Sequence, residues 1–273
     1  MSRPPLTVAA VTPRLAATTL IVRDGEPGLE LLMVRRSLQA SFMPGAYVFP
    51  GGAVDSADGS PSHQAACDEP ADQLARRIGE VTQVGELALA YAVAALRECF
   101  EECGLWLGAA DHHQPRNGWA SLRARLQTGE TLAALAHEAG GRLATSVLQP
   151  WSRWVTPVGL PKRFDTLFFV VRAPVGQRPE VDARETTTLA WVHPAAALDQ
   201  HREGAFPMEF ATVSTVRSLQ PFASADALLA HAAAQRSLPP LHPRLKTDAE
   251  GRIAGVLLPG EPGYDQALGA DGA

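Results

Sequence analysis

The sequence predicts an α/β fold, in which helices lie against a mixed β-sheet. Runs of β-branched and apolar residues typical of strands recur along the 273 residues, and one strongly periodic segment lies among them. Because strands and helices follow one another in both orders, the sheet is expected to be mixed. A hydrophobic fraction of 46% with 19% charged residues excludes a disulfide-stabilised miniprotein, a coiled-coil rod and a disordered tail.

The first elements are two predicted strands, 16–23 and 29–35, joined by a turn at an Asp-Gly pair. A short strand over 46–49 stops at a Pro-Gly-Gly sequence, where the glycines permit a sharp bend. The segment 55–70 is rich in Ser, Gly, Pro and Asp, so we expect an exposed excursion there.

The clearest helix is predicted over 86–103. Its apolar residues Leu89, Val93, Leu96 and Phe100 recur at spacings of four, three and four, as one face of a helix requires. A glycine follows directly and ends the helix.

The remaining chain continues to mix the two kinds of element. Further helices are expected over 120–127, 131–139, 195–201 and 211–234, the last in two pieces broken near Pro221. Further strands are expected over 151–156, 164–172 and 186–192, with a terminal hairpin formed by 241–246 and 252–258.

Three carboxylates crowd the end of the predicted 86–103 helix. At about 100° per residue, Glu98, Glu101 and Glu102 share one arc opposite the apolar face. Like charges repel, and the helix dipole also opposes acids at a C-terminus. Hard oxygen ligands suit Mg²⁺ or Mn²⁺, so the cluster is either a metal site or the solvated acidic face of an amphipathic helix.

The segment from Arg97 to Leu105, Arg-Glu-Cys-Phe-Glu-Glu-Cys-Gly-Leu, resembles the second half of the Nudix hydrolase signature at every fixed position. Gly52 would be the first glycine of that signature. In the family the arginine follows this glycine by 14 positions, whereas Arg97 follows Gly52 by 45, so about 31 residues are inserted. Asp58 stands where the family has a Glu. It is either a partner for Arg97 or simply a turn aspartate.

The residues before the glycine pair resemble the Nudix branch related to the peroxisomal coenzyme A diphosphatases. Leu31-Leu32, Arg36-Ser37, Gly45 and Phe49-Pro50-Gly51-Gly52 fall at the spacing of that branch, but Ser41 replaces its second arginine. Arg35 and Arg36 are either ligands of a diphosphate or solubilising residues at the end of a strand.

The resemblance implies a Nudix-type α/β/α sandwich with a mixed β-sheet and helical insertions. It implies one domain over 16–265, preceded by an extension, 1–15, and followed by a tail, 266–273. The insertions are expected at about 59–84 and 109–148, as a lid or a dimer contact.

The resemblance also implies metal-dependent hydrolysis of a diphosphate bond in a nucleoside diphosphate linked to another moiety. Coenzyme A or acyl-coenzyme A is the first candidate substrate, and ADP-ribose or NADH the second. A non-catalytic nucleotide sensor is the alternative. Glu98, Glu101 and Glu102 would hold Mg²⁺ or Mn²⁺, Gly51 and Gly52 would complete the metal shell or accommodate the diphosphate, and Arg97 would orient the carboxylates.

The general base is expected to be one of these glutamates or a loop carboxylate, of which Glu185 is the first candidate and Glu203 a weaker one. A zinc site built from Cys99 and Cys103 with the histidines at 112 and 113 is disfavoured, because the helix lacks the short Cys-x-x-Cys spacing.

The overall charge and cysteine content restrict the partners and the compartment. A net charge of −5 argues against nucleic acid, which requires a surplus of Lys and Arg. No apolar stretch reaches the roughly 20 residues that a membrane-spanning helix needs, and no secretory signal is evident. Three cysteines are too few for a disulfide framework. We therefore expect a cytoplasmic protein that binds a small nucleotide diphosphate. It is expected to be either a monomer or a homodimer.

Overall fold

The computed structural model describes residues 11–40, 43–109, 118–182 and 186–267. Its centre is a seven-stranded sheet in the order β3-β2-β1-β8-β7, with β4 paired to β1 and β9 paired to β2. The β1–β8 pair is parallel and the other pairs are antiparallel, which confirms the mixed sheet. These strands are β1 (Arg14–Asp24), β2 (Leu29–Arg36), β3 (Tyr47–Val48), β4 (Gly51–Ala53), β7 (Gln149–Val155), β8 (Phe164–Arg172) and β9 (Thr186–Val192).

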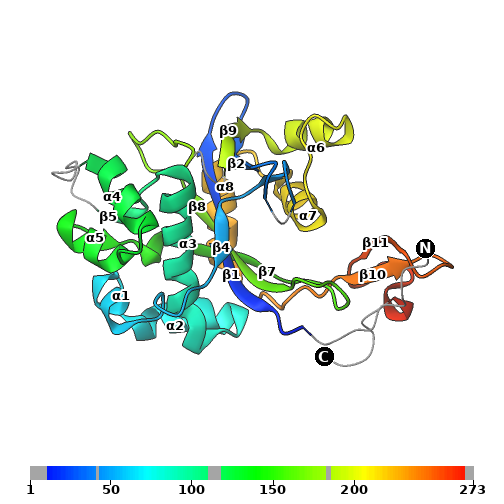
Figure 1. Cartoon of the computed structure of the whole chain (residues 1–273), viewed down its shortest axis with the longest axis horizontal. Coiled ribbons are helices and arrows are strands. Elements are labelled where there is room, and N and C mark those ends of the chain that lie inside the picture. Colours follow the sequence, from blue (N-terminus) through cyan, green and yellow to red (C-terminus); the bar gives the residue numbers. More distant parts are fainter. Residues whose placement is uncertain (1–10, 41–42, 110–117, 183–185, 268–273) are drawn as a thin grey trace.

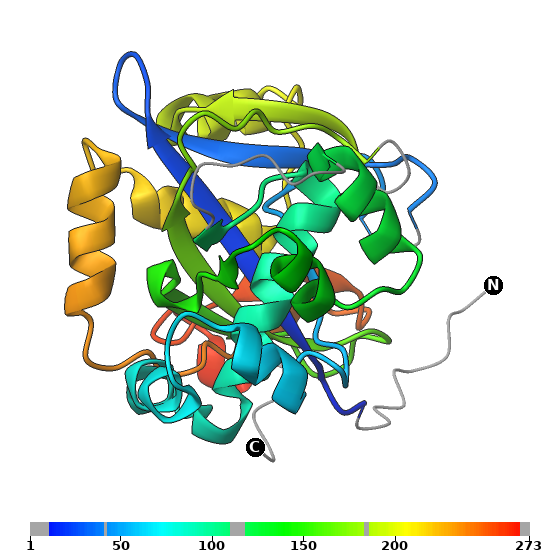
Figure 2. The same ribbon diagram turned by 90° about the vertical axis from the view of Figure 1, so that its left-hand side faces the viewer.

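Helices cover both faces of this sheet (Figures 1 and 2). Along β1, Ala17 and Ile21 point to one hydrophobic cluster, whereas Leu20 and Val22 point to the other, as the two-residue period of a strand requires. One face carries α1 (Pro61–Ala66), α2 (Ala71–Thr82), α3 (Ala88–Cys103), α4 (Gly118–Gln127) and α5 (Leu132–Glu138), and the other carries α6 (Pro194–Arg202), α7 (Phe210–Leu219) and α8 (Ala225–Ala234). The predicted α/β/α sandwich is therefore confirmed.

The segment 55–70 is exposed over most of its length, as its composition predicts, but it also contributes buried residues to the fold. Asp58 and His63 are buried, and Cys67 is only 1% exposed. The helix α2, which follows, buries Leu74 and Ile78 completely in the same core as α3. Its apolar residues recur at helical spacing, a signal that the polar composition of the region masks. The helices α4 and α5 also bury leucines in this core, so they pack against the domain as α2 does.

The smaller elements agree with the expected order of strands and helices. The terminal hairpin forms from β10 (Arg244–Thr247) and β11 (Ile253–Leu257) and extends away from the sheet (Figure 1). A second two-stranded sheet, β5 (Gly108–Ala109) with β6 (Arg142–Leu143), was not predicted. Short 3-10 helices occupy Gly85–Leu87, Thr145–Val147 and Tyr264–Gln266. Within the described parts of the chain, no helix has both the length and the apolar composition to cross a membrane.

Candidate active site

The carboxylates of α3 lie at the end of the helix that packs across β1. The hydroxyl of Thr19 donates to the carbonyl of Ala95 at 3.2 Å and ties the helix to the central strand. Gly104 then ends α3 in the left-handed conformation, with φ of 67°, which glycine adopts at low cost. The last two turns of α3 are thereby fixed against the sheet.

These carboxylates are not the solvated face of an amphipathic helix. The side chains of Glu98 and Glu101 are 14% and 24% exposed, and Glu102 is 4% exposed. Burial raises the pKa of Glu101, and Arg97 partly offsets that rise. Arg123 of α4 donates two hydrogen bonds, of 2.9 and 2.7 Å, to the Glu101 carbonyl, which places a cation at the negative end of the helix dipole.

Arg97 connects this acidic end of the helix to the chain after β4. Its guanidinium binds both oxygens of Asp58, at 3.1 and 3.0 Å, and donates to the Ala53 carbonyl at 2.8 Å. It also donates to Glu98 at 2.7 Å and to Glu101 at 3.2 Å. Burial alone would lower the pKa of Arg97, but the hydrogen bonds to Asp58 and the surrounding carboxylates raise it well above its usual value. Of the two roles considered for Asp58, the structure has the pairing with Arg97.

The glycine pair forms β4 and lies directly against α3. The N–H of Gly51 donates to Oε2 of Glu102 at 3.1 Å. A side chain at Gly52 would overlap the Glu98 carboxylate, and one at Gly51 would overlap the Ala17 carbonyl of β1. Gly51 is therefore required because a Cβ would meet the backbone of β1, whereas at Gly52 the Glu98 side chain would have to move.

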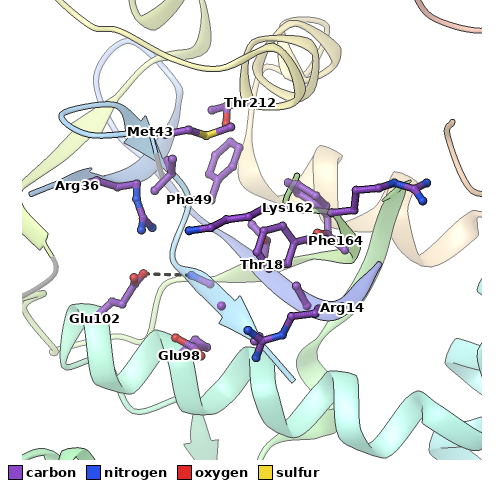
Figure 3. A pocket seen from close by; sticks show the side chains of 18 of the residues that line it. Arg14, Thr18, Arg36, Met43, Phe49, Glu98, Glu102, Lys162, Phe164 and Thr212 are labelled. Carbon is purple, nitrogen blue, oxygen red and sulfur yellow. Dashed lines mark hydrogen bonds between the residues drawn. The ribbon is translucent and has the colours of Figure 1, made fainter. Parts of the chain in front are cut away.

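A cavity of about 850 Å³ opens between the glycine pair, α3 and the first residues of β1 and β8 (Figure 3). Its walls combine three chemical types. The acidic residues are Glu98, Glu101, Glu102 and Asp182; the basic residues are Arg14, Arg36, Lys162 and Arg163; and the larger apolar residues are Met43, Val48, Phe49, Phe164 and Phe168.

The structure separates the two predicted substrate-binding arginines. Arg36 lines the cavity and in Figure 3 points toward Glu102. Arg35 instead donates to the Gly45 carbonyl at 3.1 Å and places its guanidinium over the ring of Tyr47. Its prediction as a residue facing the diphosphate is not supported by this position.

Of the described carboxylates in the loops near β9, one borders the cavity. Glu185 lies outside the described residues, and Glu203 is exposed at the end of α6. Asp182, which sequence reasoning missed, lines the cavity and accepts hydrogen bonds of 2.8 and 2.9 Å from the amide and hydroxyl of Thr186. Its place just before β9 is the signal that favoured Glu185, so the same reasoning applied to the whole loop would have found it.

Glu98, Glu101 and Glu102 all offer carboxylate oxygens, which suit a hard divalent cation. In the side-chain positions of the described residues, however, no three acidic, His or Cys groups converge on one point. Glu98 and Glu101 each direct an oxygen to Arg97, and Glu102 accepts from Gly51. Side-chain rotation would therefore be needed for these residues to share an ion.

The cysteines of α3 do not resemble zinc ligands. Cys99 and Cys103 are fully buried, and burial raises the pKa of both thiols well above the ordinary value. The thiol of Cys99 donates to the Leu105 carbonyl at 3.7 Å. Such thiols are inert packing residues. The histidines at 112 and 113 lie outside the described residues.

The fold, the signature on α3 and the cavity beside it define a Nudix hydrolase. The family model of the NUDT19 Nudix domain matches residues 68–213, and the chain belongs to this family.

Among curated proteins, the chain is 26% identical over 210 residues to the acyl-coenzyme A diphosphatase NUDT19 of Xenopus laevis, covering 63% of this chain and 55% of that protein. It is 28% identical over 277 residues to the human protein of the same name, covering 87% and 72%. It is also similar to the putative nudix hydrolase 7 of Caenorhabditis elegans, at 23% identity with 74% and 59% covered. The chain thus spans little more than half of the length of the frog and nematode proteins.

A crystal structure of a NUDIX hydrolase from Alicyclobacillus acidocaldarius superposes with a TM-score of 0.66 at 27% identity. The match covers 81% of this chain and 97% of that structure. It supports the Nudix fold described above.

Proposed function

We propose that this Nudix hydrolase cleaves the diphosphate bond of coenzyme A or acyl-coenzyme A with the help of Mg²⁺ or Mn²⁺. The observation that carries the proposal is the shared cavity wall: the three glutamates of α3, the glycine pair and Arg36 all border the same space. The names of the frog and human relatives support coenzyme A as the first substrate to test.

The proposed roles of the residues follow from their positions. Glu98, Glu101 and Glu102 would hold the ion, which when bound neutralises a diphosphate and lowers the pKa of an attacking water. The Gly51 N–H fixes the position of Glu102, and the backbone of Gly52 would complete the metal shell. Arg97 is a positioning residue, because its hydrogen bonds to Glu98 and Glu101 orient these two carboxylates.

The size and lining of the cavity suit a substrate larger than a diphosphate. A volume of about 850 Å³ lies within the usual range of small-molecule sites. Met43, Phe49 and Phe164 offer apolar surface to the parts of a ligand on either side of the phosphates. Ser41, which replaces the second arginine of the coenzyme A motif, lies outside the described residues.

The general base is proposed to come from the loop before β9. Glu185 remains a proposal, and the cavity position of Asp182 makes it the second candidate. Asp182→Asn and Glu185→Gln, assayed separately across a pH series, distinguish them. The variant that loses the acidic limb of the pH–rate profile identifies the base.

The domain organisation is proposed from the sheet. The strands of the sheet come from residues 14–192, which favours one domain over 16–265 with the two insertions packed onto it. A cytoplasmic location, a homodimer and the absence of nucleic acid binding stay predictions of the sequence.

The substrate is tested with a panel of coenzyme A, acyl-coenzyme A, ADP-ribose and NADH, each incubated with Mg²⁺ or Mn²⁺ and analysed by mass spectrometry. We expect coenzyme A to be split into adenosine 3′,5′-bisphosphate and 4′-phosphopantetheine. Preferential release of AMP from ADP-ribose or NADH would contradict the choice of substrate. Binding without any cleavage would favour the nucleotide sensor instead.

A further inference from the structure

We propose that Lys162 and Arg36 form a cationic clamp that holds the diphosphate of the substrate against the carboxylates of α3. The inference rests on the proposed function only in requiring a diphosphate, not in requiring coenzyme A. Neither the identity of the nucleotide nor that of the leaving group enters it.

Lys162 reaches the cavity from a segment remote from the Nudix signature. It lies in the connection between β7 and β8, whereas Arg36 ends β2. Both residues line the same cavity as Glu98 and Glu102. In Figure 3, the amine of Lys162 extends across the cavity toward the side on which Arg36 lies, on the wall opposite α3.

The residue that follows Lys162 is fixed by three hydrogen bonds. The amide of Arg14 donates to the carbonyl of Arg163 at 2.9 Å, which starts the parallel pairing of β1 with β8. The guanidinium of Arg163 donates to the Thr156 carbonyl at 3.0 Å and to the Val11 carbonyl at 2.8 Å. Lys162 therefore directly precedes an anchored residue, and its own side chain is exposed.

A clamp of this kind answers an electrostatic problem of the site. The α3 wall presents three carboxylates, which repel a diphosphate unless cations lie on its other side. Ion binding at the carboxylates compensates one side of the anion, and Lys162 with Arg36 would compensate the other.

The composition of the chain makes the proposal easy to test. Of its 24 basic residues only two are lysines, Lys162 and Lys246. Lys246 lies on β10 and is exposed, so it is a matched control for both chemical modification and mutation.

The first experiment measures amine acetylation by peptide mass spectrometry on the full chain, with and without Mg²⁺. We expect ADP to slow the acetylation of Lys162 several-fold, AMP to do so much less, and neither to alter Lys246. Equal rates at Lys162 with and without ADP would overturn the clamp. This readout needs no turnover, so it stands even if coenzyme A proves not to be a substrate.

The second experiment measures turnover of whichever diphosphates the protein hydrolyses. Lys162→Gln is expected to lower kcat/KM about 10- to 100-fold, as the loss of a charge-assisted contact does. Lys162→Arg should recover most of this, and Lys246→Gln should stay within twofold of the unaltered protein. The loss should be the same for coenzyme A and for dephospho-coenzyme A. A loss confined to the 3′-phosphorylated substrate would show that Lys162 reads another phosphate and would overturn the proposal.

Discussion

Asp58 and Arg97 form a buried two-point ion pair, although 39 residues separate them along the chain. Their side chains are 2% and 11% exposed, and the pair joins the segment after β4 to the helix that carries the acidic cluster. Asp58 stands six residues after Gly52, at the place where the Nudix signature has a glutamate. The pair therefore joins two positions of the signature that are distant along this chain.

Removal of one partner of this pair should destabilise the fold, because a buried guanidinium would lose its main counter-charge. Asp58→Ala is expected to lower the free energy of unfolding by about 3–5 kcal/mol in urea denaturation. The exposed pair Asp72–Arg76 on α2 provides the control, since Asp72→Ala should change stability by less than about 1 kcal/mol. Similar effects of the two substitutions would show that Asp58 is not a structural partner.

The two glycines of β4 should respond differently to the same substitution. At Gly52, a methyl group meets the flexible end of Glu98, so Gly52→Ala should fold but hydrolyse more slowly as Glu98 is displaced. At Gly51, it meets the backbone of β1, so Gly51→Ala should lower the melting temperature by several degrees. Thermal denaturation and steady-state rates of both variants check this. A fully active Gly52→Ala protein would contradict the position of Glu98 described here.

The sequence predicted the elements whose pattern is local. The α3 helix has an uninterrupted apolar period, and β8 has the continuous apolar run of a strand buried on both faces, so both appear where expected. The Asp58–Arg97 pair was one of the two roles considered for Asp58, because the signature has an acid at that position.

The features that were missed depend on contacts between distant segments. A Ser-, Gly- and Asp-rich stretch hides α1 and the buried His63 and Cys67, since composition does not show which of its residues reach the core. Arg35 and Arg36 are neighbours in sequence, yet only the packing of Arg35 on Tyr47 decides which one borders the cavity. Lys162 enters the site through the parallel pairing of β1 with β8, for which no local pattern exists.

The first insertion should contribute to stability as part of the core. Leu74 of α2 is fully buried, so Leu74→Ala is expected to cost about 2–5 kcal/mol in urea denaturation while the metal requirement of the reaction stays the same. Leu38 is 76% exposed, and Leu38→Ala should alter stability by less than about 0.5 kcal/mol. A stable Leu74→Ala protein would mean that α2 is detached from the core.

The stability of the protein should fall in alkali because of its buried thiols. Burial raises the pKa of Cys67 from an ordinary 9.0 to about 11, so the native state keeps a proton that the unfolded chain releases. The contribution of the protonated thiol to the free energy of unfolding is complete below pH 9. It is lost as pH rises toward 11, at up to about 1.4 kcal/mol per pH unit for each such thiol. Urea denaturation at pH 8, 9 and 10.5 checks this. Cys67→Ala should reduce the slope, and an unchanged slope would contradict the assignment.

The most direct test of the central claim compares Glu102→Gln with the unaltered protein in Mg²⁺-dependent release of adenosine 3′,5′-bisphosphate from coenzyme A. A glutamine can still accept the hydrogen bond from Gly51, so the variant should fold normally while turnover falls by more than about 100-fold. Glu86→Gln, at the exposed start of the same helical region, should leave the rate within twofold. If Glu102→Gln hydrolyses coenzyme A at the rate of the unaltered protein, the carboxylates of α3 are not the catalytic centre.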